Sequence, residues 1–239
     1  MTWYSEDART DRSTNFGHGA IDTSRTAPHV RRYAIVKPFL VGLLLLILPL
    51  RGCQTSVALR VGDKDLAKPT DPANLTVTLL SRARDIRDKP RDQVGRQTAT
   101  LFMLPGPQVE LEEGRLDRAI SKNVKTALEI SGYTVAMVDR LREATGPVVV
   151  VQIDDLRNYL FSWLYPIGII WGKMQLSLHV LAPDGRELWA NTTEGHWGLM
   201  ASLFYMSGFE TRLQSDLKAN LNQVIAMVSS EEFKKQIRP

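Results

Sequence analysis

The sequence predicts an α+β domain, with an antiparallel or mixed sheet and two helices packed on one of its faces. Several short segments alternate apolar and polar residues or are rich in β-branched residues, as strands are. Two longer segments carry apolar residues at helical spacing. No internal repeat and no Rossmann or phosphate-binding loop is visible. The expected order is two strands, a helix, a strand, three further strands and a final helix, which is typical of an α+β fold.

The first two strands are expected at residues 75–80 and 98–104. Leu75–Leu80 alternates as a half-buried strand does. Residues 81–96 mix six basic and three acidic residues with proline, which indicates a solvated loop or, alternatively, a loop that binds a partner or lipid headgroups. The second strand is expected to stop at Pro105-Gly-Pro107.

The first helix is expected from Leu116 to Leu128, where apolar residues recur at helical spacing. Ser131-Gly132 supplies the stop signal. Strand composition resumes at residues 133–138, and the β-branched run at residues 147–153 predicts a central strand. Asp154-Asp155 is either an acid–base pair or the end of that strand. The end of the strand is favoured, because adjacent strand residues point to opposite faces and cannot converge without a bulge.

A hairpin and a second helix complete the predicted domain. Met174–Val180 alternates, and Pro183-Asp-Gly185 turns the chain back into residues 186–193. Ser207 and Glu210 fit a capping box in front of the last helix. One apolar stripe runs along that helix: Phe209, Leu213, Leu217, Leu221, Val224 and Val228.

An aromatic segment at residues 159–171 stands out from this pattern. Tyr159, Phe161, Trp163 and Tyr165 alternate with Leu160 and Leu164, and Pro166-Ile-Gly168 supplies a turn, so we expect the tip of a long hairpin. A second apolar patch follows at residues 197–206. These segments either complete the core or contact a partner protein or a membrane. The candidate contact residues are Tyr159, Phe161, Trp163, Tyr165, Trp171 and Trp197.

The composition fits one globular domain with appendages. The chain has 239 residues, is 44% apolar and carries a net charge of +4. Seven of its 30 basic and four of its 26 acidic residues precede Cys53, so the remainder has a charge of only +1. This near-neutral remainder gives no electrostatic footprint for nucleic acid, which is therefore not an expected partner.

An export signal is predicted before Cys53. Residues 39–50 are an uninterrupted apolar run of 12 residues, preceded by Arg31, Arg32 and Lys37. A helix of this length spans roughly 18 Å, short of the ~30 Å hydrocarbon core, so the run is typical of a signal peptide. The alternative is a short, uncleaved membrane anchor.

Leu50-Arg-Gly52-Cys53 resembles the bacterial lipobox, in which the cysteine is lipidated and becomes the first residue after cleavage. The resemblance implies cleavage between Gly52 and Cys53, and acyl chains on Cys53 that hold the protein on a membrane. Gln54 after the cysteine points to the outer membrane, facing the periplasm. Cys53 is the only cysteine, so no intramolecular disulfide can form.

The predicted organisation has four parts. Residues 1–29 lack apolar periodicity and are expected to be a disordered leader, or to reflect a start that belongs at Val30. Residues 30–52 form the signal peptide, residues 53–73 the lipidated cysteine and a flexible tether, and residues 74–239 the periplasmic domain.

The layout of residues 75–235 resembles small envelope lipoproteins of the YajG type and, more distantly, LptE-like and transport-auxiliary lipoproteins. The similarity includes Asp85-Ile-Arg87, Val94-Gly95, Ser131-Gly-Tyr133 and Gly185–Trp189, and a terminal helix that closes near Phe233. The resemblance implies a non-catalytic domain that binds a protein or lipid partner in envelope transport or assembly.

The residues themselves predict no catalytic, metal or cofactor site. Only His179 and His196 follow Cys53, without a metal-binding spacing, and no nucleophile motif is present. His179 is expected to be exposed or hydrogen-bonded. A second functional hypothesis is a small-ligand or lipid carrier with a cleft between sheet and helices; a third is a hydrolase.

Overall fold

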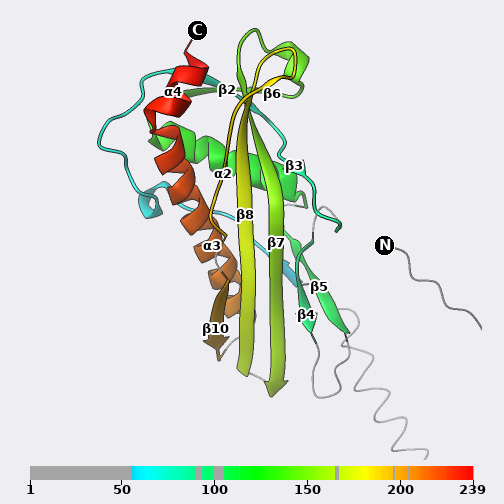
Figure 1. Ribbon diagram of the computed structural model, residues 1–239. Helices are drawn as coiled ribbons and strands as arrows, with labels where there is room; N and C mark the ends of the chain where they lie inside the picture. Colours follow the sequence, from blue (N-terminus) through cyan, green and yellow to red (C-terminus); the bar gives the residue numbers. More distant parts are fainter. Residues whose placement is uncertain are drawn as a thin grey trace, which may run out of the picture. The chain divides into compact units, whose positions relative to one another are not determined.

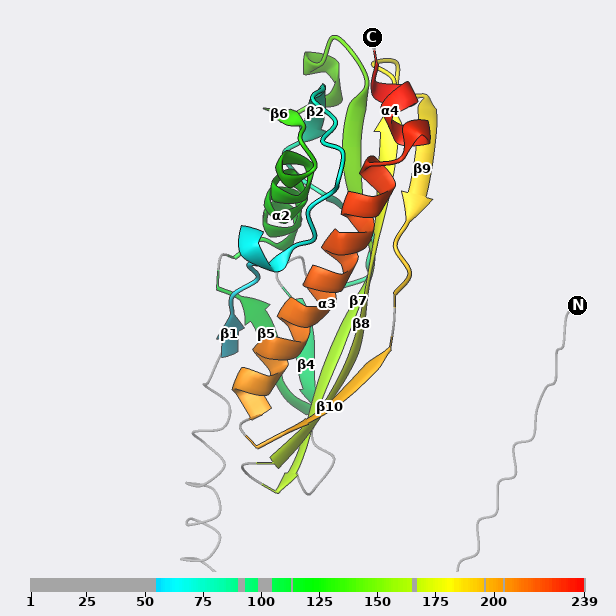
Figure 2. The same cartoon turned by 90° about the vertical axis from the view of Figure 1, so that its left-hand side faces the viewer.

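The computed structural model describes residues 55–89, 93–98, 105–112, 114–164, 167–195, 197–203 and 205–238. These residues form a mixed sheet covered by helices on one face, so the predicted α+β fold is confirmed (Figures 1 and 2). The strands are β1 (Thr55–Val57), β2 (Thr76–Leu80), β3 (Arg84–Asp85), β4 (Gln93–Thr98), β5 (Pro105–Leu111), β6 (Thr134–Val138), β7 (Val148–Leu164), β8 (Ile167–Leu181), β9 (Glu187–Thr192) and β10 (Gly198–Ser202). The helices are α2 (Leu116–Ile130), α3 (Tyr205–Val228) and α4 (Glu231–Ile237).

A long antiparallel hairpin, β7 and β8, is the centre of the sheet. On the outer side of β7, the strands β2, β3 and β4 pair with it one after another, all in parallel. On the outer side of β8, β9 pairs near one end and β10 near the other, both antiparallel. β6 extends the sheet beyond β2, and β5 and then β1 extend it beyond β4.

The core lies between this sheet and the helices α2 and α3. The predicted stripe of α3 is completely buried, from Phe209 to Val228. It packs mainly on β8, and α2 lies against α3. Phe233 of α4 closes the core near the C-terminus. The centroid of its ring lies 5.1 Å from that of Trp189 and 6.0 Å from that of Tyr133. Burial of these large apolar side chains is the main favourable contribution to folding.

Most predicted elements are found close to their expected bounds. The helix that was expected at residues 116–128 ends at Ile130, and Gly132 adopts φ of 86°, a left-handed conformation that favours glycine after a helix. The strands expected at residues 75–80 and 133–138 and the hairpin through Gly185 are confirmed. The predicted central strand is also confirmed, but it continues to Leu164.

The tether prediction is wrong for its described part. Thr55–Val57 pairs in parallel with Val109–Leu111, and Val57, Leu59 and Leu66 are buried in the core. Val57 and Leu59 alternate with their neighbours over too few residues to predict a strand, and Leu66 stands alone, but each finds a place against the sheet or the helices. The folded domain therefore includes residues before position 74.

The segment expected to be a solvated loop at residues 81–96 contributes to the sheet. Arg84 and Asp85 pair with β7, and Val94 is fully buried in β4. The side chains of Asp85 and Arg87 form an ion pair and are only 6% and 4% exposed. The ion pair allows both charged side chains to be buried. An alternation of apolar and polar residues in the sequence does not reveal burial of this kind.

Three predicted boundaries are also wrong. Pro105 begins a strand instead of ending one, because proline is tolerated at a first strand position. Asp154 lies inside β7 at a register shift, where its carboxylate accepts hydrogen bonds from Gln152 and Ser177. α3 begins at Tyr205, so Ser207 lies within the helix and Glu210 accepts a hydrogen bond from Gln214 in place of forming a capping box.

Candidate functional site

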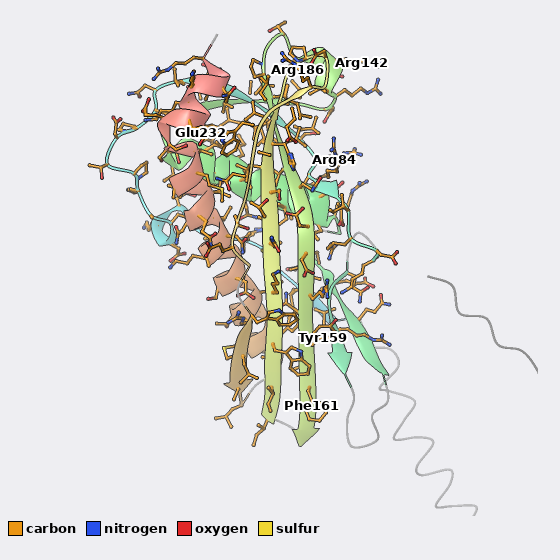
Figure 3. The ribbon with its side chains drawn as sticks, in the orientation of Figure 1. Arg84, Arg142, Tyr159, Phe161, Arg186 and Glu232 are labelled. Atoms are coloured by element: carbon orange, nitrogen blue, oxygen red, sulfur yellow. The ribbon has the colours of Figure 1, made fainter. Side chains whose placement is uncertain are left out.

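The aromatic segment forms the part of the β7–β8 hairpin nearest its tip, as predicted. Tyr159 pairs with Trp171, Leu160 with Ile170 and Phe161 with Ile169. Leu160 and Ile170 are fully buried on the helix-covered face. Tyr159, Phe161 and Trp171 lie on the opposite face and are half-buried. Figure 3 shows Tyr159 and Phe161 on the distal half of β7, away from Arg142 and Arg186.

Aliphatic residues continue this apolar surface on the neighbouring positions of the helix-free face. Ile167 and Ile169 are 48% and 40% exposed, and Leu199 of β10, which pairs with Trp171, is 74% exposed. Large apolar side chains with this exposure, gathered in one place, mark contact with another molecule more often than isolated ones do. We refer to the following set as the hairpin patch: Tyr159, Phe161, Ile167, Ile169, Trp171 and Leu199.

Basic residues border the hairpin patch on the side away from the tip. Arg157 pairs directly with Lys173 across β7 and β8, and exposed Arg96 pairs with Tyr159. The ammonium group of Lys89 lies 5.8 Å from the centre of the Tyr159 ring, within the range of a cation–π contact. Asp155 accepts a hydrogen bond of 2.8 Å from Arg157.

The pKa of Lys89 reflects this basic surrounding. Burial lowers it first, because a charged ammonium is less favourable away from water. The positive charges of Arg87 and Arg157 lower it further, and Asp155 partly opposes them. The border of the hairpin patch thus brings Arg87, Lys89 and Arg157 close together beside Asp155.

The structure brings together three of the predicted contact residues, and a fourth is exposed at the start of the neighbouring strand. Tyr159, Phe161 and Trp171 are in the hairpin patch, and Trp197 is 59% exposed just before β10. Trp163 lies within β7, but its side chain is outside the described residues, as is all of Tyr165. Gly52 and Cys53 are outside the described residues too.

Sequence reasoning placed Leu199 only within the second apolar patch at residues 197–206, and it missed the basic border of this surface. A signal for the border was present: no charged residue stands between Arg157 and Lys173. Because the two strands of a hairpin pair antiparallel, residues at equal distances before and after its turn lie opposite each other. The two basic residues that flank the uncharged segment are therefore expected to be neighbours across the strands.

Several other polar side chains of the described sheet bond to one another. His179 Nδ1 lies 2.6 Å from Glu187, as its predicted hydrogen-bonded state requires. Ser177 Oγ donates to Asp154 and lies 2.7 Å from Thr192 Oγ1. Among the described residues, no group of three or more acidic, histidine or cysteine side chains is placed to hold a metal ion.

The interface between sheet and helices is filled by side chains. Leu156, Leu160, Met174 and Leu176 are at most 1% exposed beneath α2 and α3. A surface pocket of about 430 Å³ lies elsewhere, between residues 67–71 and the C-terminal part of α3 with the start of α4. In the part of the chain that the structure describes, no helix has both the length and the apolar character needed to cross a membrane.

Comparison with known proteins gives no family assignment. No family model and no curated protein matches the chain. A Xanthomonas campestris protein of family DUF330 aligns with 76% of this chain and 95% of its own at 13% identity and a TM-score of 0.45. A neuraminyllactose-binding hemagglutinin homologue from Helicobacter pylori covers 71% and 92% at 10% identity and a TM-score of 0.41. The PelC dodecamer from Paraburkholderia phytofirmans covers 72% and 95% at 11% identity and a TM-score of 0.38. The likeness to YajG-type lipoproteins stays a prediction from the sequence.

Proposed function

We propose that this chain is a non-catalytic lipoprotein of the bacterial envelope, anchored through Cys53 on the periplasmic side of the outer membrane. Its hairpin patch binds a protein or lipid partner in envelope transport or assembly. The observation that carries the proposal is the exposure of the hairpin patch on the face of the sheet that the helices leave open.

The exposure of the hairpin patch supports a binding role over a structural one. The core beneath the opposite face is already complete, since Leu160 and Ile170 are fully buried. Leu199 and Trp197 contribute little to that core at 74% and 59% exposure. Aromatic side chains are enriched where proteins meet other proteins or membrane interfaces.

The lipid anchor is supported by the sequence around Cys53. The apolar run that precedes it is too short to span a bilayer, and Gly52 is the small residue that lipidation signals carry before the cysteine. With two or more acyl chains on one residue, membrane attachment is stable without a spanning helix.

Metabolic labelling with a fatty acid tests the anchor. The wild-type chain is expected to incorporate the label, and the variant Cys53→Ala is expected to lose it. An unlabelled wild-type chain that stays in the membrane fraction would instead support the alternative of an uncleaved N-terminal anchor.

The binding role has its own test. Changing Trp163 and Tyr165 to Ser is expected to leave the thermal unfolding transition nearly unchanged and to abolish co-purification of the partner. Loss of folding in this variant would place both residues in the core. The carrier hypothesis finds less support, because tightly packed side chains fill the space between sheet and helices.

A further inference from the structure

Apolar and charged residues follow a fixed order along the helix-free face of the hairpin. Ile167 and the pair Phe161 and Ile169 lie nearest the tip, followed by the pair Tyr159 and Trp171. The next pair on this face is Arg157 and Lys173. Successive residues on one face of a strand are ~7 Å apart. A row of Phe161 with the two isoleucines, an aromatic row that Leu199 continues on β10, and a basic row therefore succeed one another over about 20 Å.

This order matches the environments at the surface of a bilayer. Aliphatic side chains are favoured in hydrocarbon, tryptophan and tyrosine gather at the interface, and lysine and arginine bind lipid phosphates. A protein partner requires no such order, since protein interfaces place apolar residues at their centre and polar ones around the whole rim.

The charges of the basic row also favour an anionic surface. Arg157 and Lys173 are directly opposite each other, and like charges in this position repel. Asp155 bonds to Arg157, but Lys89 and Arg96 add positive charge beside the same row. Anionic headgroups that bind between these side chains would relieve the repulsion.

The direction of β1 shows that the described chain begins on the side of the sheet where the hairpin tip lies. β1 runs parallel to β5, and β5 begins at Pro105, which pairs with Thr98 beside Phe161. The N-terminal end of β1 therefore points toward the hairpin tip. Cys53 precedes Thr55 by two residues, which span at most about 7 Å, so acyl chains on Cys53 and the hairpin patch can reach one bilayer surface.

We infer that the hairpin patch docks on an anionic bilayer surface, with its two apolar rows in the interface and its basic row at the lipid phosphates. The inference rests on the proposed function, because the lipid on Cys53 holds the domain at that surface. It assigns the lipid bilayer, and not a protein, as the occupant of the patch.

The test uses the full-length, lipidated protein in vesicles of phosphatidylcholine and phosphatidylglycerol. One cysteine is introduced in the hairpin patch (Ile169→Cys) or, as the matched control, at exposed Arg142 at the far end of the sheet (Arg142→Cys) (Figure 3). Each is labelled with the fluorophore NBD. Quenching by lipids that carry a nitroxide near the top of the acyl chain is expected to be roughly threefold stronger at position 169 than at position 142.

A second reporter and a charge variant make the result independent of one substitution. Leu199→Cys on β10 is expected to be quenched as strongly as Ile169→Cys. Adding Arg96→Glu and Lys173→Glu to Ile169→Cys is expected to reduce quenching about twofold in anionic vesicles. The control pair Lys122→Glu and Lys218→Glu, exposed on α2 and α3, changes the net charge equally and is expected to leave quenching unchanged.

The outcomes separate the inference from the proposed function. If the wild-type chain itself reacts with the thiol reagent, Cys53 is not lipidated and the proposed anchor is wrong. If the wild-type chain does not react but quenching is equal at positions 169 and 142, the anchor stands and docking on the membrane is overturned. In that case the bilayer is not the occupant of the hairpin patch, and a protein partner is the occupant to test next.

Discussion

Tyr159 stacks on Trp171 across β7 and β8, with 5.7 Å between the ring centroids and 25° between the ring planes. Both residues are half-buried on the helix-free face, whereas their neighbours Leu160 and Ile170 are fully buried on the other. An aromatic pair of this kind contributes about 0.5–1.5 kcal/mol beyond the area that it buries. The pair therefore stabilises the hairpin modestly and leaves much of its surface available for contact.

Replacing Trp171 with Ser is expected to reduce the free energy of unfolding by only about 1 kcal/mol, mainly through loss of the stacking contact. The matched control is Trp189→Ser, because Trp189 is 8% exposed and packs on Phe233 in the core. That variant is expected to lose about 3–5 kcal/mol. Urea denaturation of both variants measures the difference, and equal losses would show that Trp171 belongs to the core.

A buried amide provides a second prediction. Asn158 is 2% exposed on the core face of β7, and neither its side-chain nitrogen nor its side-chain oxygen has a hydrogen-bond partner among the residues that the structure describes. Leaving such groups unpaired costs about 1–3 kcal/mol. Asn158→Leu, which is similar in size and apolar, is expected to raise the free energy of unfolding by about 1 kcal/mol.

The residue opposite Asn158 provides the comparison for this variant. A Cβ atom on Gly172 would lie 1.8 Å from the Asn158 side-chain oxygen, so Gly172 leaves the space that the amide occupies. Gly172→Ala is expected to lower the free energy of unfolding by about 1–3 kcal/mol through overpacking. Thermal unfolding monitored by circular dichroism distinguishes the two directions. A loss of stability in Asn158→Leu would contradict the unpaired state of the amide.

The fold was predictable where burial is periodic along the chain. The stripe from Phe209 to Val228 and the alternation from Met174 to Val180 each follow one face of an element, so the pattern identified them. The beginning of the domain was not predictable in this way. Val57 and Leu59 alternate over too few residues to predict a strand, and Leu66 stands alone. The burial of Val57 depends on pairing of β1 with β5, which is distant in sequence.

The candidate site was predictable only in part for a related reason. Alternation placed Tyr159 and Phe161 on one face of a hairpin, but it could not tell which face the helices cover. Leu199 joins the patch because β10 pairs with β8, and Lys89 because its chain crosses near Tyr159. Such contacts between distant segments depend on the tertiary fold, on which local patterns carry no information.

Asp216 makes stability depend on pH. Its carboxyl group is buried, which raises its pKa to about 6, although the ion pair with Arg212 partly opposes the shift. Because the pKa is raised on folding, the protonated form favours the folded state. This contribution is complete below the unfolded pKa of about 4 and is lost as the pH rises through about 6.

The variant Asp216→Asn isolates this contribution. The free energy of unfolding of the wild type, minus that of the variant, is expected to fall by on the order of 2 kcal/mol between about pH 4 and about pH 7.5. Urea denaturation of both chains at several pH values measures the difference, and the other carboxyl groups cancel in the subtraction. A difference that stays constant across this range would mean that Asp216 titrates as an exposed carboxyl group does.

Two Asp–Arg pairs with the same spacing, Asp85–Arg87 and Asp155–Arg157, differ mainly in burial. Arg87 is 4% exposed, bonds to both Asp85 oxygens and donates to the Gln93 carbonyl at 3.0 Å. Arg157 is 54% exposed and bonds to Asp155 with its Nε atom.

The variant Arg87→Ala leaves a buried carboxylate uncompensated, and it is expected to lower the free energy of unfolding by about 3–5 kcal/mol. Arg157→Ala removes an exposed partner and is expected to cost less than about 1 kcal/mol. Denaturant unfolding with each variant measures both values. A small loss in Arg87→Ala would mean that residues 84–87 are solvated, as the sequence pattern had suggested, and that β3 does not hold this segment on the sheet.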